Sequence, residues 1–383
     1  MKDKEKITKN ILKNIVYKLF CGSKEKKGDS KRVNISGVFD IIFPIVAVIL
    51  SLIIGMFIIW AANKSPIQAY KALFLGAFGD LNAIGNTLSR ATPLIFTGLG
   101  VAIAFKCGLF NIGVEGQLLV GAMAAAIIGH YVTFLPEPFH LIVTVLGAII
   151  AGSLWGLVPG LLKAYRGVHE VLISIMMNYI GISLISFVVE KLRQTGVPKT
   201  PDVLKSAEFM RFSEIFKNSF GESTVSVGFI FAIIASILVY ILIEKTVLGY
   251  ELRAVGTSPQ AAENGGIKIS KNILIVMIIS GALAGFAGAD RVLGEYHCLI
   301  SGVSAGLGFE GMAVALLVNN NPIGIIFSGI LFGALASGGL NMSLFAGVPQ
   351  EIVSMIQAII IFFIAGNKII KQFINNRKKE VKA

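Results

Sequence analysis

Long apolar runs separated by short polar stretches dominate the chain. The first run, residues 41–62, contains no charged residue, and a helix of that length crosses about 30 Å of hydrocarbon at about 1.5 Å per residue. Further runs of this kind lie at 85–105, 109–130, 141–162, 171–190, 225–243, 272–293, 304–318, 322–342 and 350–366. The pattern predicts an all-α polytopic membrane protein with about ten transmembrane helices.

The basic residues indicate the orientation of these helices. Most of the 34 Lys and Arg lie in a tail at 1–40, a tail at 367–383 and a loop at 244–271. Basic residues stay on the cytoplasmic side of a membrane. We therefore expect a multi-pass protein of the cell (cytoplasmic) membrane, with a transmembrane domain at 41–366 and both termini in the cytoplasm. The run at 304–318 is short for a crossing, but without it the basic C-terminal tail would lie outside.

Composition excludes a soluble domain. Of the 383 residues, 55% are hydrophobic and only 15% are charged, and the mean hydropathy is +0.77. The net charge of +12 follows from the cytoplasmic bias of the basic residues, so it does not indicate nucleic-acid binding. The leader has no small-residue cleavage site, which predicts a retained first helix. An apolar patch at 11–20 could form an amphipathic helix on the inner leaflet.

Two shorter stretches predict helices that do not cross. Residues 65–78 begin with Ser-Pro, a favourable cap and first helical position, and we expect this helix along the outer surface. In the loop 244–271, the run TSPQAAENGG predicts a short helix with Ser258 as N-cap, Pro259 at the first position and a stop at Gly265 or Gly266. Such a helix can be a docking element or an ordered loop without a partner.

A carboxylate and two amides occur inside apolar sequence at FNIGVEGQ, residues 110–117. A charge in hydrocarbon is costly, so an intramembrane Glu usually marks a functional path. Glu115 is therefore a candidate, together with Asn111 and Gln117. The alternative is that the glycines permit close helix packing while Glu115 pairs with Lys106 or Arg90 near the cytoplasmic mouth.

A second Gly-x-Glu-Gly segment indicates an internal repeat. GVEGQLLVGA at 113–122 resembles GFEGMAVALL at 308–317, and EVLISIM from Glu170 resembles EIVSMIQ from Glu351. Four predicted spans at 85–190 and four at 272–366 would then form an inverted repeat, in which glycine-interrupted segments line a central path. The candidate path residues are Asn111, Glu115, Gln117, Asn178, Phe309 and Glu310. Amides and aromatic rings suit an uncharged, hydrogen-bonding solute that carries a ring.

Other polar features carry less weight. Asp290 and Arg291 are adjacent near the predicted outer end of their span, which suggests a local ion pair or an interface anchor. The outer loop 191–224 contains both basic and acidic residues and is expected to be a solvated surface that could meet a partner. The sequence contains no phosphate-binding loop, no Cys/His metal spacing and no nucleophile elbow, so we expect neither a bound metal nor ATP hydrolysis by this chain.

These segments together resemble the permease subunits of ABC importers in the branched-chain amino acid, ribose and nucleoside group. The matching segments are FNIGVEGQLLVGA, VHEVLISIMMNYIG, GYELRAVGTSPQAAENGGI, GFEGMAVALLVNNNPIGIIFSGILFGAL and QEIVSMIQAIIIFF, in this order between about 85 and 366. FNIGVEGQ with MMNY is more similar to the nucleoside (simple-sugar) type than to the amino acid or ribose types.

The resemblance implies an importer with several subunits. The partners would be a second permease, giving a heterodimer, an ABC ATPase that uses the ATP, and a substrate-binding lipoprotein. The substrate would be a purine or pyrimidine nucleoside, or alternatively a simple sugar such as ribose or a galactoside. The loop 244–271 would carry the coupling helix, with the coupling residues Gly256, Ser258, Pro259, Ala261, Ala262, Glu263 and Gly266. A proton-coupled secondary transporter, with Glu115 and Glu310 as proton carriers, is the competing class.

Overall fold

The computed structural model describes residues 35–363 apart from 194–196 and 217–219, together with residue 366. The chain divides into two compact units, 1–42 and 43–383. Of the first unit, only the beginning of helix α2 (Ile35–Ala61) belongs to the described residues. The predicted amphipathic helix at 11–20 and the tail at 367–383 lie outside the described residues.

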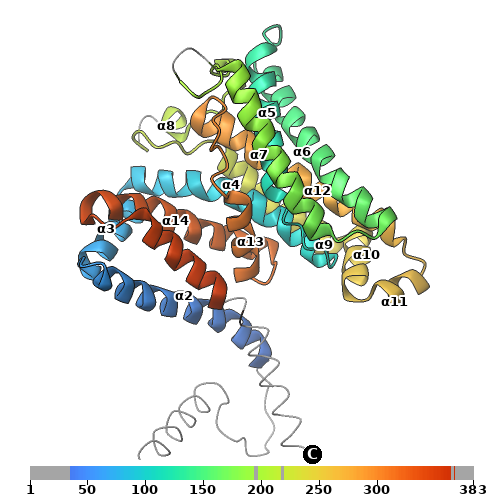
Figure 1. Cartoon of the computed structure of the whole chain (residues 1–383), viewed down its shortest axis with the longest axis horizontal. Helices are drawn as coiled ribbons and strands as arrows, with labels where there is room; N and C mark the ends of the chain where they lie inside the picture. Colours follow the sequence, from blue (N-terminus) through green and yellow to red (C-terminus); the bar gives the residue numbers. More distant parts are fainter. Residues whose placement is uncertain (1–34, 194–196, 217–219, 364–365, 367–383) are drawn as a thin grey trace, which may run out of the picture. The chain divides into compact units, whose positions relative to one another are not determined.

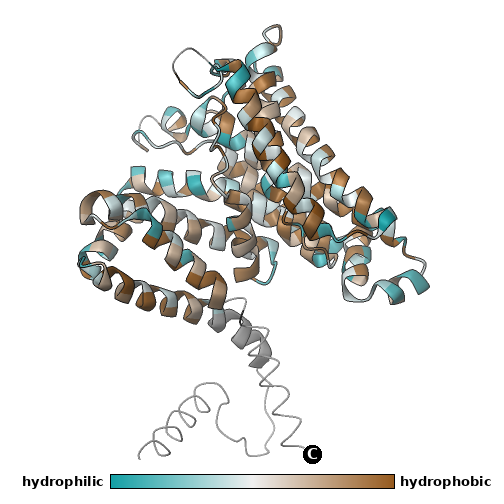
Figure 2. Cartoon of the chain, in the orientation of Figure 1, coloured by the Kyte–Doolittle hydropathy of each residue, from teal (hydrophilic) through white to brown (hydrophobic). Residues whose placement is uncertain are grey.

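The described part of the second unit is helical, and no named strand occurs in it. Among the described residues, seven helices are long and apolar enough to cross a membrane, which confirms an all-α polytopic membrane protein (Figures 1 and 2). They are Pro44–Ala61 of α2, α4 (Leu81–Lys106), α6 (Phe139–Arg166), α7 (Glu170–Leu192), α9 (Gly228–Lys245), α12 with the π-helix η2 (Ile269–Tyr296) and α14 (Pro322–Ala346). Helix α5 (Val114–Tyr131) also has 18 residues but is not among these seven. Shorter apolar helices of the described part are α13 (Leu307–Leu317) and Gln350–Phe363.

Helix α13 is shorter than the predicted span at 304–318. Its 11 residues rise about 16 Å at about 1.5 Å per residue, roughly half of the hydrocarbon thickness. The residues before it form turns, and Gly306 has the left-handed φ of 87°. The total of ten crossings and the cytoplasmic C-terminus therefore stay predictions.

Helix α3 (Pro66–Phe78) forms as the Ser-Pro signal predicts. Ser65 is its N-cap, and the Ser65 hydroxyl accepts a hydrogen bond of 3.5 Å from the Gln68 amide. The helix packs against α14, where Ser337 Oγ donates to the Gly76 carbonyl oxygen at 3.1 Å. Its position on the outer surface stays a prediction.

The first helix of each predicted half packs against helices of the other half. Helix α4 packs on α13 and α14, whereas α12 packs on α5 and α6, and α4 also contacts α12. The approaches are close: a Cβ added to Gly152 of α6 would lie 2.3 Å from the Gly281 carbonyl oxygen of α12. Likewise, a Cβ on Gly333 of α14 would lie 2.6 Å from the Thr87 carbonyl oxygen of α4. This reciprocal packing is what two related halves would give, although the repeat itself stays a prediction.

The loop at 191–224, which we call the outer loop after the side predicted for it, is ordered against the end of α12. It contains a 3-10 turn (Lys205–Ala207) and the short helix α8 (Phe212–Ile215). The Val203 amide donates to the His297 carbonyl oxygen at 2.8 Å, and the Phe209 amide donates to the Leu293 carbonyl oxygen at 3.0 Å. These backbone bonds fix the described part of the loop on the protein, while charged side chains such as Lys205, Glu214 and Glu222 stay exposed.

The suggested ion pair between Asp290 and Arg291 is wrong. Arg291 is only 5% exposed, and its guanidinium instead pairs with Glu295 one turn later in η2 (Arg291–Tyr296). It also donates to Tyr296 Oη at 2.6 Å and to the Val303 carbonyl oxygen at 3.1 Å. Asp290 accepts from Ser226 Oγ at 3.4 Å. The adjacent side chains point to different partners because successive residues of a helix lie about 100° apart around its axis.

Candidate functional site

The predicted path residues gather around the turn between α4 and α5. Gly108 has the left-handed φ of 76° and reverses the chain just after α4 ends at Lys106. Asn111 then lies in the turn, where its Oδ1 accepts from the Gly113 amide at 3.0 Å, a local bond typical of Asn in turns. Helix α5 therefore begins at Val114, and the predicted span at 109–130 starts too early.

Two amides join the helices around this turn. Asn111 Nδ2 donates to Ser280 Oγ of α12 at 2.8 Å and to Gln117 Oε1 at 3.3 Å. Asn178 Oδ1 of α7 accepts from the Gly116 amide at 2.8 Å, and its Nδ2 donates to the Ile112 carbonyl oxygen at 3.0 Å. A buried amide with its hydrogen bonds satisfied is stable in an apolar interior. We call Asn111, Gln117, Asn178 and Ser280 the amide cluster.

The amide cluster is closed in this structure. Asn111 is 1% exposed, Gln117 is 0% exposed and Asn178 is 4% exposed. Within the described residues, two buried polar atoms here have no hydrogen-bond partner, Gln117 Nε2 and Ser174 Oγ. Most of the polar capacity of the cluster therefore holds α5, α7 and α12 together, and a solute would reach it only after these helices separate.

Glu115 joins α5 to the start of α13 and to the segment before it. The side chain is 3% exposed, Ser304 Oγ donates to Oε1, and the Gly308 amide donates to Oε2 at 2.7 Å. A Cβ added to Gly308 would lie 2.5 Å from Glu115 Cα, so only glycine permits this approach. Among the described residues Glu115 forms no ion pair, so the alternative pairing with Lys106 or Arg90 is wrong.

Phe309 and Glu310 follow Gly308 in the first turn of α13. The Phe309 ring is 46% exposed, and Glu310 is partly buried. The structure therefore brings all six predicted path residues to the start of α5 and the start of α13, with Asn178 joining them from α7. Only Phe309 among them presents a large exposed surface.

Sequence reasoning missed Glu170 and Lys163 as partners of this region. Glu170 is 8% exposed at the start of α7, its carboxylate lies 2.8 Å from Lys163 Nζ, and it accepts from the Phe110 amide at 3.5 Å. The pair fixes the turn before α5 to the loop between α6 and α7. The sequence did contain a signal for this pair, because Lys163 and Glu170 flank a short loop between two predicted spans.

A second candidate site is the short helix α11 (Pro259–Asn264), which follows α10 (Val247–Thr257). Ser258 is its N-cap, and Ser258 Oγ accepts from the Ala261 amide at 3.4 Å. Pro259 is at the first position, Gly265 is the C-cap, and Gly266 has the left-handed φ of 83°. The predicted short capped helix is confirmed. Figure 2 shows that α11 is more hydrophilic than the long helices.

The predicted coupling residues divide into packed and exposed positions. A Cβ on Gly256 would lie 2.2 Å from the Lys106 carbonyl oxygen, and Ala262 is 5% exposed, so both pack against the helices above. Pro259, Ala261 and Glu263 are exposed. Gly256 and Gly266 are exposed as well, although Gly256 leaves no room for a side chain, so Ala262 is the one buried position among the seven predicted coupling residues.

Comparison with known proteins agrees with this architecture. The family "Branched-chain amino acid transport system / permease component" matches residues 83–365. The guanosine ABC transporter permease protein NupP of Bacillus subtilis is 40% identical over 341 residues, covering 89% of this chain and 97% of the relative. The nucleoside ABC transporter permease protein NupB of Lactococcus lactis is 36% identical over 343 residues, covering 88% and 94%.

A third relative is the glucose ABC transporter permease protein TsgB13 of Haloferax volcanii, 29% identical over 336 residues and covering 86% of this chain and 88% of the relative. No solved structure matches the chain. The family match covers most of the chain, and two relatives exceed 30% identity over nearly their full length. The chain therefore belongs to the branched-chain amino acid transport system permease family, whose members are membrane subunits of ABC transporters.

Proposed function

We propose that this chain is the permease of an ATP-driven importer and forms the translocation path for nucleosides. The observation that carries the proposal is the similarity, over nearly the whole chain, to permeases named for guanosine and for nucleosides, at 40% and 36% identity. The relative named for glucose is 29% identical, so a simple sugar is the second candidate.

The chemistry of the α5–α13 region suits a nucleoside. An exposed aromatic ring such as Phe309 can stack on a base, and stacking tolerates different bases. Gln117 Nε2 is a buried donor without a partner among the described residues, and it becomes available if α5 separates from its neighbours. In this proposal the path runs beside Phe309 and Glu310 and opens towards the amide cluster during alternating access.

The ATP is used by a separate subunit. This chain is a permease component, and the proposed site of coupling is the exposed surface of α11 at Pro259, Ala261 and Glu263. The complete importer would contain a second permease, an ABC ATPase and a substrate-binding lipoprotein at the outer mouth. The chain itself needs no cofactor in this scheme.

The experiment is uptake of labelled guanosine in cells that co-express this chain with its candidate partner subunits. We expect uptake to stop when ATP is depleted and to continue when the proton gradient is collapsed at constant ATP. Uptake by this chain alone that an ionophore abolishes would instead identify a proton-coupled carrier, and Glu115 and Glu310 would then be the proton-carrying candidates.

A further inference from the structure

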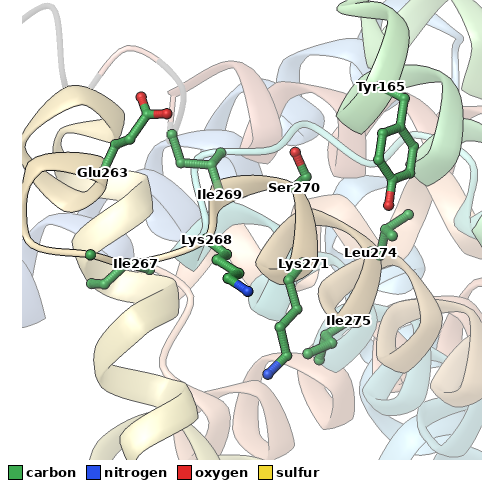
Figure 3. A pocket seen from close by; sticks show the side chains of 10 residues that line it. Tyr165, Glu263, Ile267, Lys268, Ile269, Ser270, Lys271, Leu274 and Ile275 are labelled. Carbon is green, nitrogen blue, oxygen red and sulfur yellow. The ribbon is translucent and has the colours of Figure 1, made fainter.

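A pocket of about 820 Å³ lies between the end of α6, the start of α12 and the helix α11 (Figure 3). This volume falls within the range of about 300–1,000 Å³ that is typical of small-molecule sites. Its apolar wall includes Ile267, Leu274 and Ile275, and its polar groups include Lys268 and Lys271. The pocket is separate from the amide cluster, and it adjoins the exposed surface of α11, with which it shares Glu263.

The two lysines are uncompensated cations. Among the described residues neither Lys268 nor Lys271 forms an ion pair, and both are exposed. Figure 3 shows their ammonium groups directed to the same side, with the Glu263 carboxylate at the opposite end of the pocket. Lys163 near the end of α6, by contrast, lies 2.8 Å from the carboxylate of Glu170. The pocket therefore offers positive charge to an anionic ligand.

The pocket lies at the ends of two helices, α6 and α12, that are long and apolar enough to span a membrane. Tyr165, in the last turn of α6, is 67% exposed beside the pocket, and Tyr is enriched at the membrane–water interface. About one turn further into each helix, Leu161 of α6 is 40% exposed and Ile278 of α12 is 36% exposed. An exposed apolar surface thus continues from the pocket towards the hydrocarbon.

We propose that this pocket binds the phosphate headgroup of an anionic phospholipid, with its acyl chains along α6 and α12. A water-soluble anion would use the lysines but not the apolar wall, whereas a phospholipid uses both. Basic pockets between transmembrane helices on the cytoplasmic side are suited to acidic lipids. The bound lipid would stabilise the connection between α11 and α12. This connection is loosely packed, since a Cβ added to Gly266 would meet no atom within 4 Å. The proposal does not depend on which solute the permease carries.

The test is native mass spectrometry of the full-length chain, released from micelles that contain equal amounts of phosphatidylglycerol and phosphatidylcholine. We expect the wild type to retain phosphatidylglycerol. The Lys268→Gln/Lys271→Gln double variant should lose affinity for it by about 30-fold, since each lysine near a lipid headgroup contributes about fivefold. The Lys268→Arg/Lys271→Arg variant should retain the lipid because it keeps both charges.

The matched control is Lys191→Gln/Lys205→Gln, which removes two exposed lysines from the far end of α7 and from the outer loop. It should retain phosphatidylglycerol as the wild type does. The proposal would be overturned if Lys268→Gln/Lys271→Gln and the control Lys191→Gln/Lys205→Gln lost phosphatidylglycerol equally. It would also be overturned if the wild type retained phosphatidylcholine as well as phosphatidylglycerol. Displacement of the lipid by millimolar inorganic phosphate or glycerol 3-phosphate would also overturn it, because the site would then bind a free anion.

Discussion

Glu115 Oε2 accepts a hydrogen bond of 2.7 Å from the backbone amide of Gly308, which lies 193 positions later in the chain. Ser304 Oγ donates to the other oxygen of the same carboxylate. The first turn of α5 is thus joined to the first turn of α13 and to the segment before it. Any movement that separates these two helices during transport has to break these hydrogen bonds.

Replacing Glu115 with Ala should destabilise the protein and impair uptake. The Gly308 amide and the Ser304 hydroxyl would be left buried without an acceptor, at a cost of about 1–3 kcal/mol for each group. We expect a lower thermal unfolding midpoint and reduced guanosine uptake. Glu222→Ala is the control, since Glu222 is exposed in the outer loop. Equal effects of the two substitutions would mean that the contact has no special role.

The substitution Gly308→Ala tests the same contact through its geometry. The new Cβ would lie 2.5 Å from Glu115 Cα, so α13 would have to move away from α5. A clash of this kind in a packed interior costs about 1–3 kcal/mol. The comparison is Gly302→Ala, where a Cβ meets no atom within 4 Å. We expect the unfolding midpoint to fall for Gly308→Ala only, and an unchanged midpoint would contradict the close packing.

At α11, the substitution Ala261→Arg should uncouple ATP hydrolysis from uptake without affecting membrane insertion. Ala261 is exposed on a capped helix, so a large charged side chain fits there but would obstruct a partner surface. The measurement is ATPase activity and guanosine uptake of the assembled importer, with Ala261→Ser as the conservative control. Ala262 is unsuitable because it is 5% exposed and its replacement disturbs packing. Full uptake by Ala261→Arg would remove α11 from the coupling surface.

The outer loop should lose stability in acid through His297. Arg211 Nη2 lies 2.7 Å from His297 Nε2, and because a guanidinium only donates, Nε2 must be unprotonated. Burial lowers the pKa of His297 below its ordinary value of about 6.5, and Arg211 lowers it further against the opposing effect of Glu208. The pKa is lower in the folded state, so the contribution of His297 is complete above about pH 6.5 and is lost as the pH falls.

The measurement is the unfolding midpoint at about pH 7.5 and about pH 5.5 for the wild type and His297→Asn. Asn tolerates the left-handed φ of 55° at this position, so the backbone is preserved. We expect a smaller fall in the variant than in the wild type. An identical fall would assign the acid sensitivity to other groups.

Local signals in the sequence predicted local structure well. Ser258 and Pro259 predicted the start of α11, and Ser65 predicted the cap of α3, because capping depends on residues within one turn. Hydropathy predicted the long helices because each one is a continuous apolar run in the sequence. The predicted start of α5 was wrong because the turn after Gly108 continues through apolar residues to Gly113, whose amide donates to Asn111 Oδ1.

Contacts between distant segments could not be predicted in this way. No local pattern connects Asn111 with Ser280, or Glu115 with Gly308, because these pairs form only when α5, α12 and α13 pack together. The adjacent Asp290 and Arg291 suggested an ion pair, yet Arg291 pairs with Glu295 one turn later. Sequence reasoning therefore selected candidate residues that lie close together in the structure, but it did not predict the contacts that they make.

The central claim is tested most directly in proteoliposomes that contain this chain, its second permease, the ATPase and the binding lipoprotein. The measurement is ATP-dependent accumulation of labelled guanosine, in competition with an excess of unlabelled adenosine, uridine, ribose or glucose. The account predicts that accumulation requires ATP and the lipoprotein, and that nucleosides compete while the sugars do not. Accumulation of glucose or ribose in place of guanosine would contradict the nucleoside assignment.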